Sequence, residues 1–149
     1  MFARILVPTD FSDPSEAALV YGRRLADEFD AALHVIYVAE NPFLHAVVSD
    51  RRSIEDAAMR RLQECLTEAD RRRGAVASLE QSDEPASEIL RYATSANIDL
   101  IVMGTHGRTG LARVVLGSVA EAVVRAAPCP VLTVHPAESK TVAATATAV

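Results

Sequence analysis

The sequence contains little cysteine, few aromatic residues and no long apolar segment. Its two cysteines, Cys65 and Cys129, lie far apart and form no CxxC pair, which argues against a zinc knuckle and a dithiol redox motif. Tryptophan is absent and aromatic residues make up 5% of the chain, so the core must be built mainly from aliphatic side chains. No run approaches the roughly 18 apolar residues of a membrane span, which argues against a transmembrane protein.

Excess positive charge is also missing. Fifteen Lys and Arg stand against twenty Asp and Glu, and the net charge of -5 provides no broad positive field for a nucleic-acid backbone. The basic run 71–73 stands just before Gly74 at the end of a helical pattern, where cations complement the helix dipole. The amino terminus shows no signal-peptide pattern. We therefore expect a soluble, cytoplasmic protein that binds neither nucleic acid nor membrane.

What the sequence does contain is aliphatic residues in short runs, with half of its 149 residues hydrophobic. Several of these runs are continuous and β-branched, as in strands that are covered on both faces. Apolar residues recur at helical spacing between them and predict four helices, one of which extends from Ile54 to Ala69. The expected strands cover residues 4–10, 32–39, 75–81, 99–105 and 129–135.

A repeat of one strand and one helix every roughly 30 residues is typical of βαβ units. It predicts an α/β fold of three layers: an open, parallel, five-stranded sheet of order 3-2-1-4-5 with helices on both faces, Rossmann-like in its architecture. The third strand has a polar face and is expected at an edge. We expect a single domain over residues 1–136, a disordered tail over 137–149, and a longer connection over 40–53 that is either a surface excursion or a lid.

Four of the six glycines fall between residues 102 and 124, where the fourth strand ends. Glycine leaves no Cβ in the way, so consecutive N–H groups at a strand exit can converge on an anion. Gly117 precedes Ser118 at the start of the last helix, where free N–H groups offer a second anion site. The alternative is that the glycines serve tight turns and that Ser118 caps the helix.

A second candidate site lies at the end of the first strand, in "VPTDFSD". In a sheet of order 3-2-1-4-5, strands one and four are neighbours at the point where the chain connections diverge, so Asp10 is expected to face the glycine-rich segment. Asp10 could accept hydrogen bonds from a ribose or a base, or bind a magnesium ion. Alternatively, Asp10 or Ser12 caps the first helix.

The segments "PTDFS", "HV", "MGTHGRTGLARVVLGSVAEAVV" and "CPVLTV" resemble the universal stress protein family in its ATP-binding branch. The resemblance covers residues 3 to about 136. Its G-x2-G-x9-G-[ST] signature is intact as Gly104, Gly107, Gly117 and Ser118. The resemblance implies the fold of the adenine nucleotide alpha hydrolase-like proteins, ATP as ligand with Mg or Mn on its phosphates, and a homodimer formed through the last strand.

The resemblance also implies the residues of the nucleotide site. The adenine and ribose pocket would be lined by Pro8, Thr9, Asp10 and Val35. The glycine-rich segment and the start of the last helix would hold the ribose and the phosphates. No metal site made by the protein alone is expected. The nucleotide-binding residues would be Pro8, Thr9, Asp10, Val35, Met103, Gly104, Thr105, His106, Gly107, Arg108, Thr109, Gly110, Gly117, Ser118, Val119 and Ala120.

The sequence and the resemblance together predict an ATP-binding protein of the stress response that acts through nucleotide-dependent conformation or partner binding. A dedicated enzyme is not indicated: His106 and Asp10 are candidates to activate water, but no convincing base accompanies them, and at most slow ATP hydrolysis is expected. The alternative is a nucleotide-free dimeric interaction module of the same fold. A flavin carrier is disfavoured, since the glycine-rich segment lacks aromatic side chains.

Overall fold

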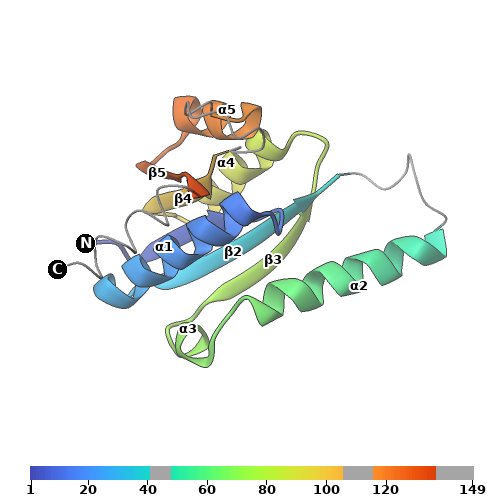
Figure 1. Ribbon diagram of the computed structural model, residues 1–149, viewed down its shortest axis with the longest axis horizontal. Helices are drawn as coiled ribbons and strands as arrows, with labels where there is room; N and C mark the ends of the chain where they lie inside the picture. Colours follow the sequence, from blue (N-terminus) through green and yellow to red (C-terminus); the bar gives the residue numbers. More distant parts are fainter. Residues whose placement is uncertain (41–47, 106–115, 137–149) are drawn as a thin grey trace.

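Five parallel strands form one sheet in the order β3-β2-β1-β4-β5 (Figure 1). The structure is a computed structural model that describes residues 1–40, 48–105 and 116–136. The predicted strand order is confirmed, and β3 lies at an edge, as its polar face indicates. The strands are β1 (Arg4–Pro8), β2 (Ala32–Ala39), β3 (Val76–Gln81), β4 (Leu100–Gly104) and β5 (Val131–Val134).

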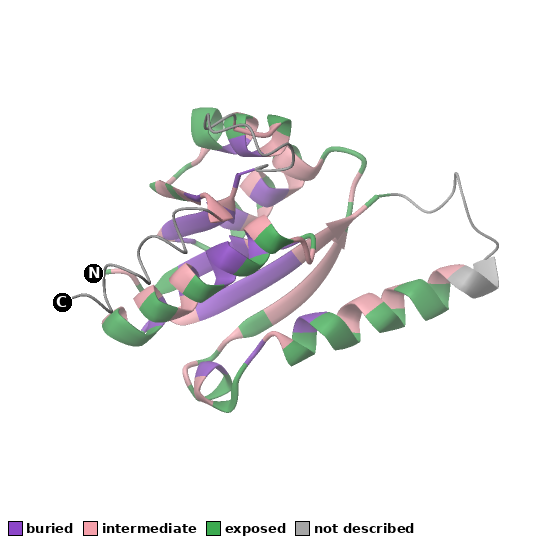
Figure 2. Cartoon of the chain, in the orientation of Figure 1, coloured by how far each residue is buried: buried purple, intermediate pink, exposed green. Residues whose placement is uncertain are grey.

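Helices cover both faces of the sheet, so the molecule has the predicted three layers (Figure 1). Helices α1 and α2 lie on one face, where Ile5 and Val7 join one buried cluster; α4 and α5 lie on the other, where Leu6 joins a second cluster. Successive side chains of a strand point to opposite faces, so both faces must be apolar. Figure 2 shows the resulting band of buried residues along the central strands.

The described residues contain five helices rather than the four predicted. The expected helix over 54–69 is interrupted, because Thr67 starts a new helix through a capping box: its hydroxyl accepts the N–H of Asp70, and the Asp70 carboxylate accepts the N–H of Thr67. None of the described helices is long and apolar enough to cross a membrane. The helices are α1 (Asp13–Phe29), α2 (Val48–Glu64), α3 (Glu68–Arg72), α4 (Pro85–Ser95) and α5 (Ser118–Ala126).

The expected connection over residues 40–53 is shorter than predicted. Helix α2 already begins at Val48, so the last part of this segment is helical, while residues 41–47 and the predicted tail over 137–149 lie outside the described residues. The prediction was wrong because the first turns of α2 carry too few apolar residues to show a helical period.

A buried carboxylate ties α3 to α1. Asp70 is fully buried and accepts a hydrogen bond from Nε of Arg23 at 3.0 Å and from Nη2 of Arg73 at 3.2 Å. Burial tends to raise the pKa of Asp70, but hydrogen bonds from Thr67 and Arg23 outweigh this effect and hold the pKa below its ordinary value. The carboxylate is therefore ionised in the folded protein at neutral pH, with its charge fully paired.

We expect Asp70→Asn to lower the free energy of unfolding by about 2 to 4 kcal/mol at pH 7, since it leaves buried donors without their charged acceptor. Because the folded-state pKa is depressed, this stabilisation is present above the unfolded pKa and is lost as the pH falls through the folded pKa. Urea unfolding at pH 7 and pH 3 measures both effects.

The matched control for this prediction is Asp27→Asn. Asp27 pairs with Arg73 from an exposed position and should contribute less than about 1 kcal/mol. Equal destabilisation by the two substitutions, or a loss at Asp70 that is undiminished at pH 3, would contradict the assignment.

Candidate functional site

The carboxyl ends of β1, β2 and β4 open into a cavity of about 570 Å³, within the size range of small-molecule sites. The pairing of β1 with β4 brings the ends of these two strands to one edge of the sheet, at the point where their helical connections diverge. Two segments far apart in the sequence therefore meet. The predicted site residues in the cavity lining are Pro8, Thr9, Asp10, Met103, Gly104, Thr105, Val119 and Ala120.

Other predicted site residues lie elsewhere. Val35 is fully buried opposite Val7 in the middle of the sheet and does not line the cavity, whereas Val38, nearer the end of the same strand, does. Ser118 is exposed and is not part of the lining either. The predicted residues His106, Gly107, Arg108, Thr109 and Gly110 lie outside the described residues.

Asp10 lies at the mouth of this cavity with its carboxylate already oriented. Its Oδ1 accepts the backbone N–H of Ser12 at 3.0 Å and also accepts the Ser12 hydroxyl. Partial burial tends to raise the pKa of Asp10, but the hydrogen bonds from Ser12, joined by Ser15, outweigh it and keep the pKa below its ordinary value. Asp10 is therefore an ionised acceptor at neutral pH, suited to hydroxyl or amine donors.

The expectation that Asp10 or Ser12 caps the first helix is answered by the same contacts. Ser12 occupies the N-cap position of α1, but its hydroxyl accepts no capping hydrogen bond, and it donates to Asp10. Ser15 donates from its hydroxyl to the Ser12 carbonyl at 2.9 Å. Asp10 thus closes a tight turn ahead of the helix rather than capping the helix itself.

A row of hydroxyl groups continues from this turn into the interior. Thr9 and Ser15 are both buried, and the Thr9 hydroxyl donates to Oγ of Ser15 at 3.1 Å while accepting the N–H of Phe11 at 3.0 Å. Every hydroxyl in this row has a partner. The row holds the turn after β1 in one conformation and so fixes the position of Asp10.

Thr105 also lines the cavity, but its hydroxyl differs from those of Thr9 and Ser15 in its hydrogen bonding. Its N–H donates to the carbonyl of Val134 at 3.0 Å, which extends the sheet pairing, and its side chain is 1% exposed. Its Oγ1 is buried and has no hydrogen-bond partner among the described residues, although the residue belongs to the cavity lining. A buried polar atom without a partner is costly, and a bound ligand is one way to satisfy it.

Gly104 has a packing role as well as a place in the cavity lining. A Cβ built on Gly104 would lie 2.4 Å from the carbonyl carbon and oxygen of Pro14, in the first turn of α1. Only glycine allows this approach, because the obstacle is backbone. The end of β4 therefore packs directly against the start of α1, so the two candidate segments lie close together.

The amino terminus of α5 also opens toward the cavity. Gly117 is the N-cap residue and Ser118 the first helical residue, which corrects the expectation that Ser118 is the cap. The first N–H groups of a helix have no partner within the helix, and the helix dipole adds positive charge there. Since Val119 and Ala120 line the cavity, an anionic ligand in the cavity would lie near this end of the helix.

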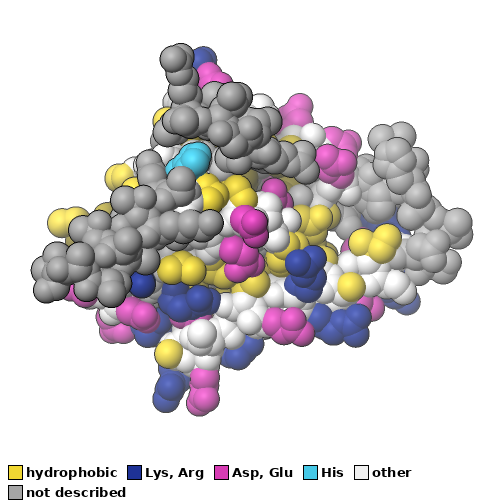
Figure 3. Space-filling view, in the orientation of Figure 1, with side chains coloured by type: hydrophobic (Ala, Val, Ile, Leu, Met, Phe, Trp, Pro, Cys, Tyr) yellow, Lys and Arg dark blue, Asp and Glu magenta, His cyan; other side chains and the backbone are white. Residues whose placement is uncertain are grey.

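Sequence reasoning missed one wall of the cavity. Tyr37 and Leu79 from the sheet, with Ile54 and Ala58 from α2, line the side between α2 and β3, and the carboxylate of Glu55 adds charge. Figure 3 shows hydrophobic side chains exposed between α1 and α2 on this face, with charged side chains around them. The available signal in the sequence was the apolar face of this helix, on which Ile54 and Ala58 lie one turn apart.

Known proteins of one family are similar to this chain in sequence and fold. The universal stress protein MJ0531 of Methanocaldococcus jannaschii is 39% identical over 140 residues, covering 90% of this chain and 82% of its own length. The solved universal stress protein UspA from Lactobacillus plantarum is 30% identical with a TM-score of 0.68, covering 89% of this chain and 97% of its own.

More distantly, a universal stress protein family protein from Arabidopsis thaliana was solved with AMP bound. It is 20% identical with a TM-score of 0.63, covering 89% of this chain and 91% of its own, and its likeness concerns the fold. The family model "Universal stress protein family" matches residues 1–135, nearly the whole chain. On the sheet order, the family match and these relatives together, the chain belongs to the universal stress protein family.

Proposed function

We propose that this protein binds ATP in the cavity at the ends of β1 and β4 and acts in the stress response through nucleotide-dependent conformation or partner binding. The observation that carries the proposal is the convergence of two chemically different residues on one cavity: an ionised Asp10 at its mouth, and Thr105, whose hydroxyl has no partner among the described residues. The AMP-bound relative from Arabidopsis thaliana supports an adenine nucleotide as the ligand class.

The parts of a nucleotide suit different parts of the lining. An adenine ring is flat and largely apolar, and Pro8, Val38 and Met103 offer apolar surface beside the strand ends. A ribose carries hydroxyl donors, for which the Asp10 carboxylate is a charged acceptor. The phosphates would lie at the amino terminus of α5, where free N–H groups and the helix dipole favour negative charge.

A divalent cation, Mg²⁺ or Mn²⁺, would bind to the phosphates of ATP and reduce their charge. The described lining carries the carboxylates of Asp10, Glu40 and Glu55 close to the proposed ligand, so a bare tetra-anion would meet repulsion there. Carboxylate and phosphate oxygens are suitable ligands for either cation. ATP should therefore bind more tightly with Mg²⁺ than in EDTA.

The alternative is a nucleotide-free dimeric interaction module, and it is favoured by the edge strand β5. This strand ends the sheet on one side and exposes Leu132, while Val124 of the neighbouring helix is also exposed. An edge strand with unpaired N–H and carbonyl groups can pair with a second copy. Native mass spectrometry of purified protein separates the two hypotheses, since only the first requires adenine nucleotide to bind.

We expect Asp10→Ala to weaken adenosine and ATP alike by about 10- to 100-fold, because both ligands lose a charge-assisted hydrogen bond to the sugar. Thr105→Val, which keeps the side-chain shape, should weaken binding by about 3- to 10-fold, and Thr105→Ser should restore it. Isothermal titration calorimetry measures all three variants. Wild-type affinity in both Asp10→Ala and Thr105→Val would refute this assignment of the cavity.

We expect Gly117→Val to weaken ATP at least about tenfold while adenosine binding stays within about twofold, since a side chain would obstruct phosphate near the start of α5. The fold should survive, because Gly117 has φ -61 and ψ 160, an extended conformation that any residue adopts. Calorimetry with both ligands and circular dichroism test this. Equal losses for ATP and adenosine would place the phosphates elsewhere.

A further inference from the structure

Phe11 holds an unusual backbone conformation beside the proposed sugar-binding carboxylate. Its φ is 62, in the left-handed region that non-glycine residues seldom adopt. The other described non-glycine residues with positive φ are Asp30 and Asn97, at the ends of α1 and α4, and short Asx side chains tolerate this conformation. Phe11 has no such side chain, so its surroundings must hold it there.

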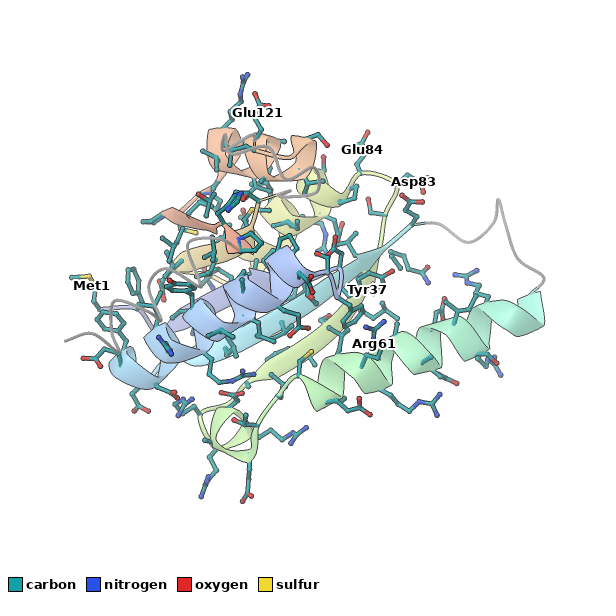
Figure 4. All side chains as sticks on the ribbon, in the orientation of Figure 1. Met1, Tyr37, Arg61, Asp83, Glu84 and Glu121 are labelled. Carbon is teal, nitrogen blue, oxygen red and sulfur yellow. The ribbon has the colours of Figure 1, made fainter. Side chains whose placement is uncertain are left out.

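Three contacts hold Phe11 in place. Its N–H donates to Oγ1 of Thr9 at 3.0 Å, its ring lies 5.0 Å from the ring of Tyr37 on β2, and Cζ of Arg61 on α2 lies 4.0 Å above its centroid. Figure 4 shows Tyr37 and Arg61 close together between α2 and the start of α1. A guanidinium over an aromatic face is attracted to the ring. Phe11 is therefore clamped from two sides.

The conformation of Phe11 determines which way the next peptide faces. The N–H and hydroxyl of Ser12 both donate to the Asp10 carboxylate across Phe11. If Phe11 left the left-handed region, the chain would turn differently at this point, and Ser12 would no longer face Asp10. The carboxylate would then lose its donors and its fixed direction toward the cavity.

We propose that Phe11, clamped between Arg61 and Tyr37, is a positioning residue that aims the Asp10 carboxylate at the sugar hydroxyls of the bound nucleotide, an inference that rests on the proposed function. It extends the site to α2, which contributes Ile54 and Ala58 to the cavity wall. Through its contact with Phe11, Arg61 then connects α2 in the cavity wall with the Asp10 carboxylate at the cavity mouth. The clamp would govern selectivity for ribose rather than affinity for adenine.

The test compares adenosine with 2′,3′-dideoxyadenosine, which lacks the 2′- and 3′-hydroxyls, by calorimetry. In the wild type adenosine should bind at least about tenfold more tightly. Arg61→Met should weaken adenosine by about 2- to 5-fold and Phe11→Ala by about tenfold, while dideoxyadenosine changes less than about twofold. Phe11→Tyr keeps the ring and should retain the wild-type ratio. Arg60→Met, at the exposed preceding position of α2, is the matched control.

A second measurement needs no ligand. The Asp10 carboxyl carbon is titrated by NMR in the wild type, Phe11→Ala and Phe11→Tyr, with circular dichroism to confirm folding. Loss of the Ser12 donors should raise the pKa of Asp10 in Phe11→Ala alone. Equal weakening of both nucleosides, or an unchanged Asp10 titration in Phe11→Ala, overturns the inference. A wild type that binds neither nucleoside overturns the proposed function instead, and the titration still decides whether Phe11 orients Asp10.

Discussion

The parallel pairing of β1 with β4 is the constraint on which the candidate site depends. Ile5 aligns with Leu100 and Leu6 with Ile101, so the two strands end side by side although residues 9–99 separate them in the sequence. The strand connections then leave in different directions, and the space between them becomes the cavity. Without this pairing, Asp10 and Thr105 would not line the same cavity.

Two kinds of packing meet at this edge of the sheet. Away from this edge, aliphatic side chains cover both faces of the sheet, and their burial provides stability without chemical specificity. At the edge itself, the chain holds two features that cost free energy: the left-handed conformation of Phe11 and the buried hydroxyl of Thr105, which has no partner among the described residues. Such features persist where a rigid framework holds them, and they are common at functional sites.

Helix α2 connects the outer layer of the molecule to the site. Its residues form part of the cavity wall, and Arg61 contacts Phe11. Glu55 accepts hydrogen bonds from Arg51 of the same helix and from Gln81 of β3. A ligand that moved the turn after β1 would therefore act on α2 through direct contacts. This gives nucleotide-dependent conformation, the central element of the proposed function, a physical route through named side chains.

The sequence by itself determined the sheet order, the edge position of β3 and the meeting of Asp10 with the end of β4, because continuous apolar runs and βα alternation leave few right-handed arrangements. It did not predict the break before Thr67, because a capping box can end an apolar pattern. It also did not show that Val38 rather than Val35 lines the cavity, because strand periodicity does not say how far along a strand a cavity begins. Only the tertiary structure decided that α2 walls the cavity and that Arg61 and Tyr37 clamp Phe11. These contacts join residues far apart in the chain, and no local pattern records which distant side chains will meet.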